Sequence, residues 1–202
     1  MTRVFSASPP VRRMVLVGFG LLTGMAAAAY LAASARTASP DASRADFDLV
    51  DSSGRAYSLE GFPPESVLVI YFGYTTCLRA CPIALDSIVA AMDGFGAQRA
   101  AVWPVFIDMD PERAAQVSLP LYMQTFGPDF LGLTGSPDAV ARAARAFEVD
   151  VERLQFSADP GDYAMTHVSP IFLMRPGDGH PVALPPTSSP EIIAAALRAA
   201  LR

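Results

Sequence analysis

The sequence predicts an α/β sandwich around a mixed β-sheet. Two apolar runs of β-type residues, at 67–72 and 101–107, are too short to span a membrane, and each is followed by a helical pattern. Strands that alternate with helices are typical of a sheet covered on both faces. Continuous apolar strands fit the centre of such a sheet, because both of their faces are buried there.

Shorter elements complete the expected fold. Residues 47–50 and 55–59 flank Asp51-Ser-Ser-Gly54, which predicts an N-terminal β-hairpin. A helix is expected at 82–92, where Pro82 stands near the start and its missing N–H costs little. The other expected elements are a helix at 111–126 that Pro120 should kink or break, a strand at 130–133, a helix that Ser136 or Asp138 caps and that runs to Phe147, an extended segment at 148–155, a strand at 167–174 and a final helix at 190–201.

The charge distribution argues against nucleic acid as a partner. The chain has 202 residues, which suits one domain with an appendage, and all 15 basic residues are Arg. From residue 37 onward, 11 Arg stand against 20 Asp and Glu, a formal charge of 11 − 20 = −9. Binding to phosphates needs a basic surface, whereas this acidic balance is compatible with a cationic partner or a metal ion.

The N-terminal segment predicts export of the domain. Residues 14–33 carry no charge and follow Arg12 and Arg13, and a helix of this length spans about 30 Å. The positive-inside rule then predicts a cytoplasmic segment at 1–13, a single transmembrane anchor at 14–34, a linker at 35–45 and a domain at 46–202 on the periplasmic side of the inner membrane. Ala33-Ser34-Ala35 has the form of a signal-peptide cleavage site, and the Arg pair also occurs in twin-arginine signals, so both alternatives stay open.

Cys77 and Cys81 are the only cysteines, and they follow the apolar strand directly. Three residues separate them, which is not the spacing of a CxxC oxidoreductase. They can still lie within one turn at a helix start, where backbone N–H groups and the helix dipole favour thiolate. Such a pair can form a disulfide, exchange disulfides or bind a soft metal. A static disulfide is the structural alternative, although a bridge that closes so small a loop stabilises little.

The chain has two histidines, of which His167 is the candidate ligand. It stands at the edge of the expected strand at 167–174, where a histidine taken alone is more often structural. His180 follows a Gly-containing turn and is expected to be a solvated loop residue. Two thiolates and one imidazole would suit transient copper binding better than structural zinc, which prefers four ligands.

Other chemistry-bearing side chains near these positions have structural alternatives. Asp108 and Asp110 end the second central strand, where they can tune a site or form a turn. We expect Asp110 to cap the helix after Pro111, and both readings of Asp108 stay open. The three methionines Met109, Met165 and Met174 are expected to pack in the core rather than to bind metal.

Three segments occur in a characteristic order: YFGYTTCLRACP, then FIDMDPERAAQ with FGPDFLGLTG, then THVSPIFLMRPGDG. They resemble the CxxxC strand-loop, the Asp-Pro-Glu-Arg region and the single His before an apolar strand of the Sco/SenC family of copper chaperones. The resemblance covers about residues 45–201 and implies a thioredoxin-like fold with an N-terminal hairpin. It also implies that Cys77, Cys81 and His167 are the copper ligands.

The resemblance implies a membrane-anchored copper chaperone, and a thiol-disulfide reductase activity stays open. It would deliver copper to the dinuclear copper site of cytochrome c oxidase or to another exported copper protein. The alternative is a thiol-disulfide oxidoreductase that reduces the cysteines of a copper acceptor through Cys77 and Cys81. A domain that only docks partners, with a structural bridge, is the third hypothesis.

The sequence departs from the family pattern around the ligands. Thr76 stands where the family usually has His, and Thr166 stands where Asp is common. Leu78, Arg79 and Ala80 replace the more usual Pro and acidic residue between the cysteines. The three expected ligands are unchanged, so the departures concern affinity, partner and the oxidation state of copper.

Overall fold

The computed structural model describes residues 45–114 and 119–202. The expected cytoplasmic segment, the anchor and the linker up to residue 44 lie outside this part. Within the described ranges, no helix has both the length and the apolar character needed to cross a membrane. Ala45 is buried, and its N–H donates a hydrogen bond to the carbonyl oxygen of Gly179 over 2.9 Å. The packed domain therefore includes the last residue of the expected linker.

A five-stranded mixed sheet with the strand order β5-β4-β3-β8-β9 forms the centre of the domain. The middle strand β3 (Val67–Gly73) is parallel to β4 (Val102–Asp108), which is parallel to β5 (Leu131–Leu133). On its other side, β3 is antiparallel to β8 (Ile171–Met174), and β8 is antiparallel to β9 (Val182–Leu184). The predicted mixed α/β sheet is confirmed, although β9 was not predicted.

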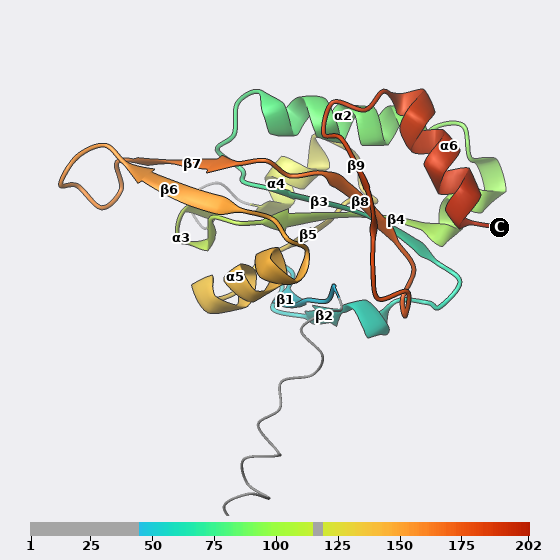
Figure 1. Ribbon diagram of the computed structural model, residues 1–202, viewed down its shortest axis with the longest axis horizontal. Coiled ribbons are helices and arrows are strands. Elements are labelled where there is room, and N and C mark those ends of the chain that lie inside the picture. Colours follow the sequence, from blue (N-terminus) through green and yellow to red (C-terminus); the bar gives the residue numbers. More distant parts are fainter. Residues whose placement is uncertain (1–44, 115–118) are drawn as a thin grey trace, which may run out of the picture. The chain divides into compact units, whose positions relative to one another are not determined.

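Helices and a hairpin cover the two faces of this sheet. In Figure 1, α2 (Ala80–Met92) and α6 (Pro190–Ala200) lie on one side. The predicted hairpin of β1 (Asp48–Val50) and β2 (Ala56–Ser58) lies on the other side with α5 (Pro137–Ala146). The hairpin and the three helices thus follow the sequence prediction.

The central strand β3 contributes side chains to both hydrophobic cores. Its residues alternate between the sheet faces, as the two-residue period of a strand requires. Val67, Val69 and Tyr71 pack into the core with α2 and α6, whereas Leu68, Ile70 and Phe72 pack into the core with α5 and the hairpin. All six side chains are buried, which explains why the run contains no charged residue.

A separate two-stranded ribbon carries His167. It consists of β6 (Val151–Gln155) and β7 (Tyr163–His167), and it extends beyond the main sheet (Figure 1). The predicted strand at 167–174 is confirmed only in its second half: β8 begins at Ile171, and His167 instead ends β7. Pro170 between them has no N–H to give to a ladder, so the backbone leaves one sheet before it enters the next.

The structure describes two helical parts of the predicted helix at 111–126, α3 (Pro111–Ala114) and α4 (Leu119–Gln124). Pro120 lies within α4 and does not end this helix. Short 3₁₀ helices at Leu59–Gly61 and Gly96–Ala101 were not predicted.

Candidate functional site

The two thiols lie together where β3 passes into α2. The N–H of Cys77 donates to the carbonyl oxygen of Tyr74 over 3.0 Å, which closes a tight turn. Cys81 is the second residue of α2, and its N–H donates to the Sγ of Cys77 over 3.4 Å. Both cysteines are buried free thiols. The predicted placement of both thiols at a helix start is confirmed.

Gly73 makes room for this pair at the end of β3. A Cβ at this position would lie 3.0 Å from the Sγ of Cys81 and 2.7 Å from Cε2 of the Phe106 ring. The carbonyl oxygen of Gly73 accepts a hydrogen bond from the N–H of Met109 over 2.8 Å, which continues the pairing with β4. Any larger residue at this position would displace either the thiol or the aromatic ring.

Asp108 ties the loop that carries Cys77 to the end of β4. Its side chain is fully buried; Oδ2 accepts from the N–H of Thr75 over 3.3 Å, and Oδ1 accepts from the N–H of Asp110 over 2.8 Å. Burial raises the pKa of this carboxyl to about 6, although the two N–H donors oppose the shift. Asp108 thus supports the site through backbone hydrogen bonds on either side of it.

The pKa values of the two thiols are shifted in opposite directions. The hydrogen bond with the Cys81 thiol, helped by the backbone N–H groups of Cys81 and Arg79 and the phenol of Tyr74, lowers the pKa of Cys77 to about 5. The same hydrogen bond, together with burial, raises the pKa of Cys81 above its ordinary value. The arrangement therefore favours a thiolate at Cys77 beside a protonated thiol at Cys81.

Three tyrosines surround the thiols, and sequence reasoning did not single them out. Burial, followed by the charges of the two cysteines, raises the pKa values of Tyr71 and Tyr122. Burial and Cys77 raise the pKa of Tyr74 to about 12. The three phenols consequently stay protonated, and the Tyr122 hydroxyl is buried without a hydrogen-bond partner among the described residues. Tyr71 and Tyr74 were readable beside the cysteines, whereas Tyr122 is far away in the sequence.

His167 lies beside Tyr74, which links it to the loop of Cys77. The two rings meet edge to face with their centroids 5.6 Å apart, and the Tyr74 hydroxyl donates to the carbonyl oxygen of Met165 over 3.1 Å. The Nδ1 atom of His167 is buried and has no hydrogen-bond partner. Burial lowers the pKa of the imidazole, while the charge of Cys77 opposes this shift. A neutral ring with a free buried nitrogen is suited to ligand binding.

The three predicted ligands do not form a closed cluster. Across residues 45–114 and 119–202, no group of three or more His, Cys, Asp or Glu side chains is placed to hold a metal ion. The structure brings Cys77 and Cys81 together at the end of the five-stranded sheet. His167 lies next to Tyr74 but belongs to the separate ribbon of β6 and β7. His180 is exposed, and its N–H donates to the carbonyl oxygen of Asp178, as a loop residue would.

The residues that depart from the expected pattern lie mostly on the surface. Leu78 is 90% exposed, and Arg79, Ala80 and Thr166 are also exposed. Only Thr76 is half-buried. Changes between the cysteines therefore alter the surface around the thiols and leave the core unchanged.

Asp110 has a different role from the predicted cap. The carbonyl oxygen of Asp110, and not its side chain, accepts from the N–H groups of Arg113 and Ala114 at the start of α3. Its carboxylate instead forms an ion pair with Arg113 and accepts from the hydroxyl of Tyr163 over 2.6 Å. Sequence reasoning missed this contact because Tyr163 is 53 residues away from Asp110.

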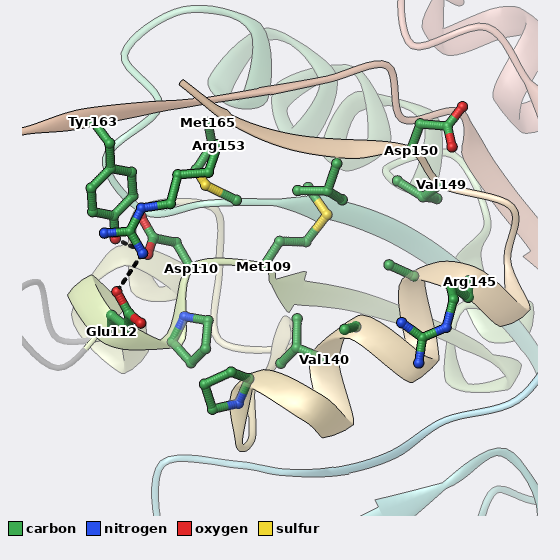
Figure 2. Close-up of a pocket in the computed structure, with 15 residues that line it drawn as sticks. Met109, Asp110, Glu112, Val140, Arg145, Val149, Asp150, Arg153, Tyr163 and Met165 are labelled. Carbon is green, nitrogen blue, oxygen red and sulfur yellow. Dashed lines mark hydrogen bonds and ion pairs between the residues drawn. The ribbon is translucent and has the colours of Figure 1, made fainter. Parts of the chain in front are cut away.

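A pocket of about 390 Å³ lies between the ribbon, α3 and α5 (Figure 2). Its lining combines apolar and charged side chains, among them Met109, Asp110, Val140, Arg153, Tyr163 and Met165. Neither cysteine nor His167 contributes to it. Met109 and Met174 are buried core residues, as predicted, whereas the half-buried Met165 lines this pocket.

Comparison with known proteins gives matches over most of the chain. The family model described as SCO1/SenC matches residues 35–202. The mitochondrial SCO2 homolog of Bos taurus is 36% identical over 137 residues, which cover 65% of this chain and 49% of the bovine protein. The SCO2-like protein RC0895 of Rickettsia conorii is 30% identical over 129 residues, which cover 64% of this chain and 62% of that protein. The chain thus spans about half to three fifths of the length of these curated relatives.

Solved structures with copper bound are similar in fold. The ScoI structure of Bradyrhizobium japonicum has a TM-score of 0.64 and 31% sequence identity, and the match covers 77% of this chain and 98% of that one. Copper-bound Sco1 of yeast has a TM-score of 0.66 and 28% identity, with 77% and 86% covered. The described domain has the same mixed α/β, thioredoxin-like fold.

Proposed function

Because the chain belongs to the SCO1/SenC family, we propose that it carries copper as cargo, bound by Cys77, Cys81 and His167. In this proposal the metal is collected, held and handed to an acceptor, so it is a substrate of the protein rather than a resident cofactor. The copper-bound structures of its relatives support copper as the metal. The acceptor would be the dinuclear copper site of cytochrome c oxidase or another exported copper protein.

The observation that carries the proposal is the donor set around Tyr74. Two sulfur atoms lie side by side, and the buried Nδ1 of His167 has no partner. An unpartnered buried polar atom costs about 1–3 kcal/mol, which a bound ligand would offset. Thiolates select soft ions such as copper(I), and imidazole suits copper in either oxidation state.

The proposed site is suited to release as well as to binding. Three protein ligands leave a position open to an acceptor, unlike a closed four-ligand structural site. Exchange of the pair with an external disulfide forms the Cys77–Cys81 disulfide: two electrons pass to the external disulfide, its two sulfur atoms leave as one thiol, which takes the proton of Cys81, and one thiolate, and both thiolate ligands are lost. Oxidation of the pair would therefore empty the site, and reduction would restore it.

We also propose that the domain works outside the cytoplasm. The uncharged segment at 14–33 behind Arg12 and Arg13 supports an anchor in the inner membrane with the domain on the periplasmic side. An exported site can meet exported copper proteins directly, and it lies in a compartment where thiols can oxidise.

A second function, thiol-disulfide reduction of an acceptor, is favoured by the unequal acidity of the cysteines. The Cys77 thiolate can attack a substrate disulfide, which forms a mixed disulfide and releases one substrate thiolate. Cys81 then loses its proton and attacks the Sγ of Cys77, which releases the second thiolate and leaves the Cys77–Cys81 disulfide. This route needs both cysteines but not His167.

Titration of the reduced full-length chain in detergent with copper(I), against a chromophoric chelator and without oxygen, tests the copper site. We expect one copper per chain, loss of binding in Cys77→Ser and Cys81→Ser, and at least tenfold weaker binding in His167→Ala. His180→Ala is the matched control and should bind like the natural chain. Equal affinity of His167→Ala and the natural chain would contradict the three-ligand site.

A further inference from the structure

The ribbon that carries His167 contacts the rest of the domain through Tyr163, at the end of β7 that is farther from His167. Tyr163 begins this strand and is buried, with 6% of its surface exposed. Its hydroxyl donates to Oδ1 of Asp110 over 2.6 Å, and its carbonyl oxygen accepts from Nη1 of Arg113 over 3.0 Å. Side chain and backbone of the same residue are thus both held by the segment after β4.

Two guanidinium groups pack against the ring of Tyr163. The Cζ atoms of Arg113 and Arg153 lie 3.8 Å and 3.5 Å from the centroid of the Tyr163 ring. Arg113 also forms a largely buried ion pair with Asp110. Arg153 forms an ion pair with Glu112, which Figure 2 shows. Cation–π contacts and charge-assisted hydrogen bonds are stronger when they are desolvated. We call Asp110, Arg113 and Tyr163 the latch.

The side chain of Asp108 forms hydrogen bonds with both the latch and the loop that carries Cys77. Asp108 accepts from Thr75, two residues before Cys77, and also from the N–H of Asp110 in the latch. The position of the latch is therefore fixed relative to the thiol loop by a segment of three residues at the end of β4. This is the segment of the sequence in which the Asp-Met-Asp motif occurs.

The direction of β7 connects the latch to the ligand. Tyr163, Met165 and His167 occupy every second position and so point to the same face of the strand. Tyr163 and Met165 line the pocket beneath the ribbon, and the carbonyl oxygen of Met165 accepts from the Tyr74 hydroxyl. At about 3.3 Å per residue, His167 lies roughly 13 Å along the strand from the latch. A shift of Tyr163 would consequently move the imidazole.

We infer that Asp110, Arg113 and Tyr163 are positioning residues that hold β7 so that His167 can join Cys77 and Cys81 around copper. The inference rests on the proposed function and adds to it the residues that orient the third ligand. The latch does not touch the metal; it acts through the ribbon. Disruption of the latch should therefore weaken the contribution of His167 and leave thiolate binding intact.

Tyr163→Phe tests this inference, because it removes only the hydroxyl that Asp110 accepts from. We expect the reduced full-length chain to bind copper(I) about tenfold more weakly, since loss of an orienting partner costs 10–100-fold in metal affinity. X-ray absorption should show loss of the imidazole scattering from the bound copper while the sulfur scattering remains. Tyr57→Phe is the matched control, because it removes a tyrosine hydroxyl near the Asp51 carboxylate on the N-terminal hairpin, and its affinity should not change.

A double-mutant cycle separates positioning from general stability. In a His167→Ala background, Tyr163→Phe should change copper affinity by less than twofold, because the ligand it positions is gone. An equal loss in both backgrounds, or no loss in either, would overturn the inference. Asp110→Asn, which keeps an oxygen acceptor but loses the charge opposite Arg113, should give the same pattern if Tyr163→Phe folds poorly.

Failure of the inference is distinguishable from failure of the proposed function. If His167→Ala binds copper as tightly as the natural chain, the three-ligand site itself is wrong. If His167→Ala binds more weakly but both latch variants bind normally, the site stands and the positioning role is wrong.

Discussion

The backbone N–H of Cys81 points at the Sγ of Cys77 across 3.4 Å, so the first turn of α2 supports negative charge on the other cysteine. The two thiols are thereby made different although they are neighbours. Cys77 lies near the surface beside the exposed Leu78, whereas Cys81 is completely buried. A reagent or a metal-bearing partner should therefore meet Cys77 first.

The reactivity of Cys77 should follow its lowered pKa. We expect alkylation of the reduced chain by iodoacetamide to rise with pH around an inflection near 5 and to level off by neutral pH, because the thiolate is the reacting species. Mass spectrometry of peptides gives the rate at each cysteine separately. Cys81 should stay unmodified under the same conditions, because its pKa is raised and it is buried.

The Cys81→Ala variant provides the control for this prediction. It removes the thiol that lowers the pKa of Cys77 most, so the inflection should move toward the ordinary value of 9. An inflection near 9 in the natural chain would contradict the proposed acidity. The same inflection in both chains would show that the Cys81 thiol is not its main cause.

Asp108 should make the stability of the domain depend on pH in a defined direction. Its pKa is raised from 3.8 to about 6, so the folded state holds this proton more tightly than the unfolded state. The tighter binding of this proton adds to the free energy of unfolding at low pH, and this contribution is lost as the pH rises through about 6. We expect the stability difference between the natural chain and Asp108→Asn to shift by about 2 kcal/mol between pH 4 and pH 7.

Urea unfolding of the two chains across this range measures the shift. The natural chain should gain relative stability as the pH falls, because the variant cannot take up the proton. Parallel stability curves would show that Asp108 is ionised over the whole range. Spectroscopic signals from several probes should coincide, so that the free energies of unfolding can be compared.

Local patterns account for the parts of the fold and site that the sequence predicts. The buried strands β3 and β4 consist of continuous apolar runs, which only a doubly covered sheet explains. Cys77 and Cys81 are four residues apart, so a helix start alone brings them together. These features depend on the chain within a few residues, and the structure confirms them.

Long-range contacts account for what the sequence does not predict. The ribbon strand β6 confirms part of the extended segment predicted at 148–155, but it is exposed along its length and shows no apolar alternation, so its pairing with the strand of His167 was not predicted. Tyr163 finds Asp110 only through the packing of this ribbon against α3. The sequence gives no sign that Gly73 leaves room for the Sγ of Cys81, because the approach of that sulfur atom depends on the fold.

The N-terminal cap of α5 should be measurable by a single substitution. The Oγ atom of Ser136 accepts from the N–H of Ala139 over 3.2 Å, so Ser136→Ala should lower the free energy of unfolding by about 1 kcal/mol. Ser189 stands at the same position of α6 but accepts no capping hydrogen bond. Ser189→Ala should therefore cost less. Urea unfolding of both variants measures the difference, and equal costs would show that the Ser136 hydrogen bond adds nothing.

Gly73→Ala should damage the thiol site more than its size suggests. The added Cβ would lie within 3.0 Å of the Sγ of Cys81 and closer still to Phe106, and both are fully buried. Overpacking of a filled core costs about 1–3 kcal/mol. We expect this loss in urea unfolding, together with weaker copper(I) binding, because the Cys81 sulfur must shift.

Gly61→Ala is the matched control: its Cβ meets only the Ser58 hydroxyl at 3.8 Å, so stability should change by less than about 0.5 kcal/mol. If Gly73→Ala lowers stability but binds copper normally, the Phe106 ring and not the thiol has moved.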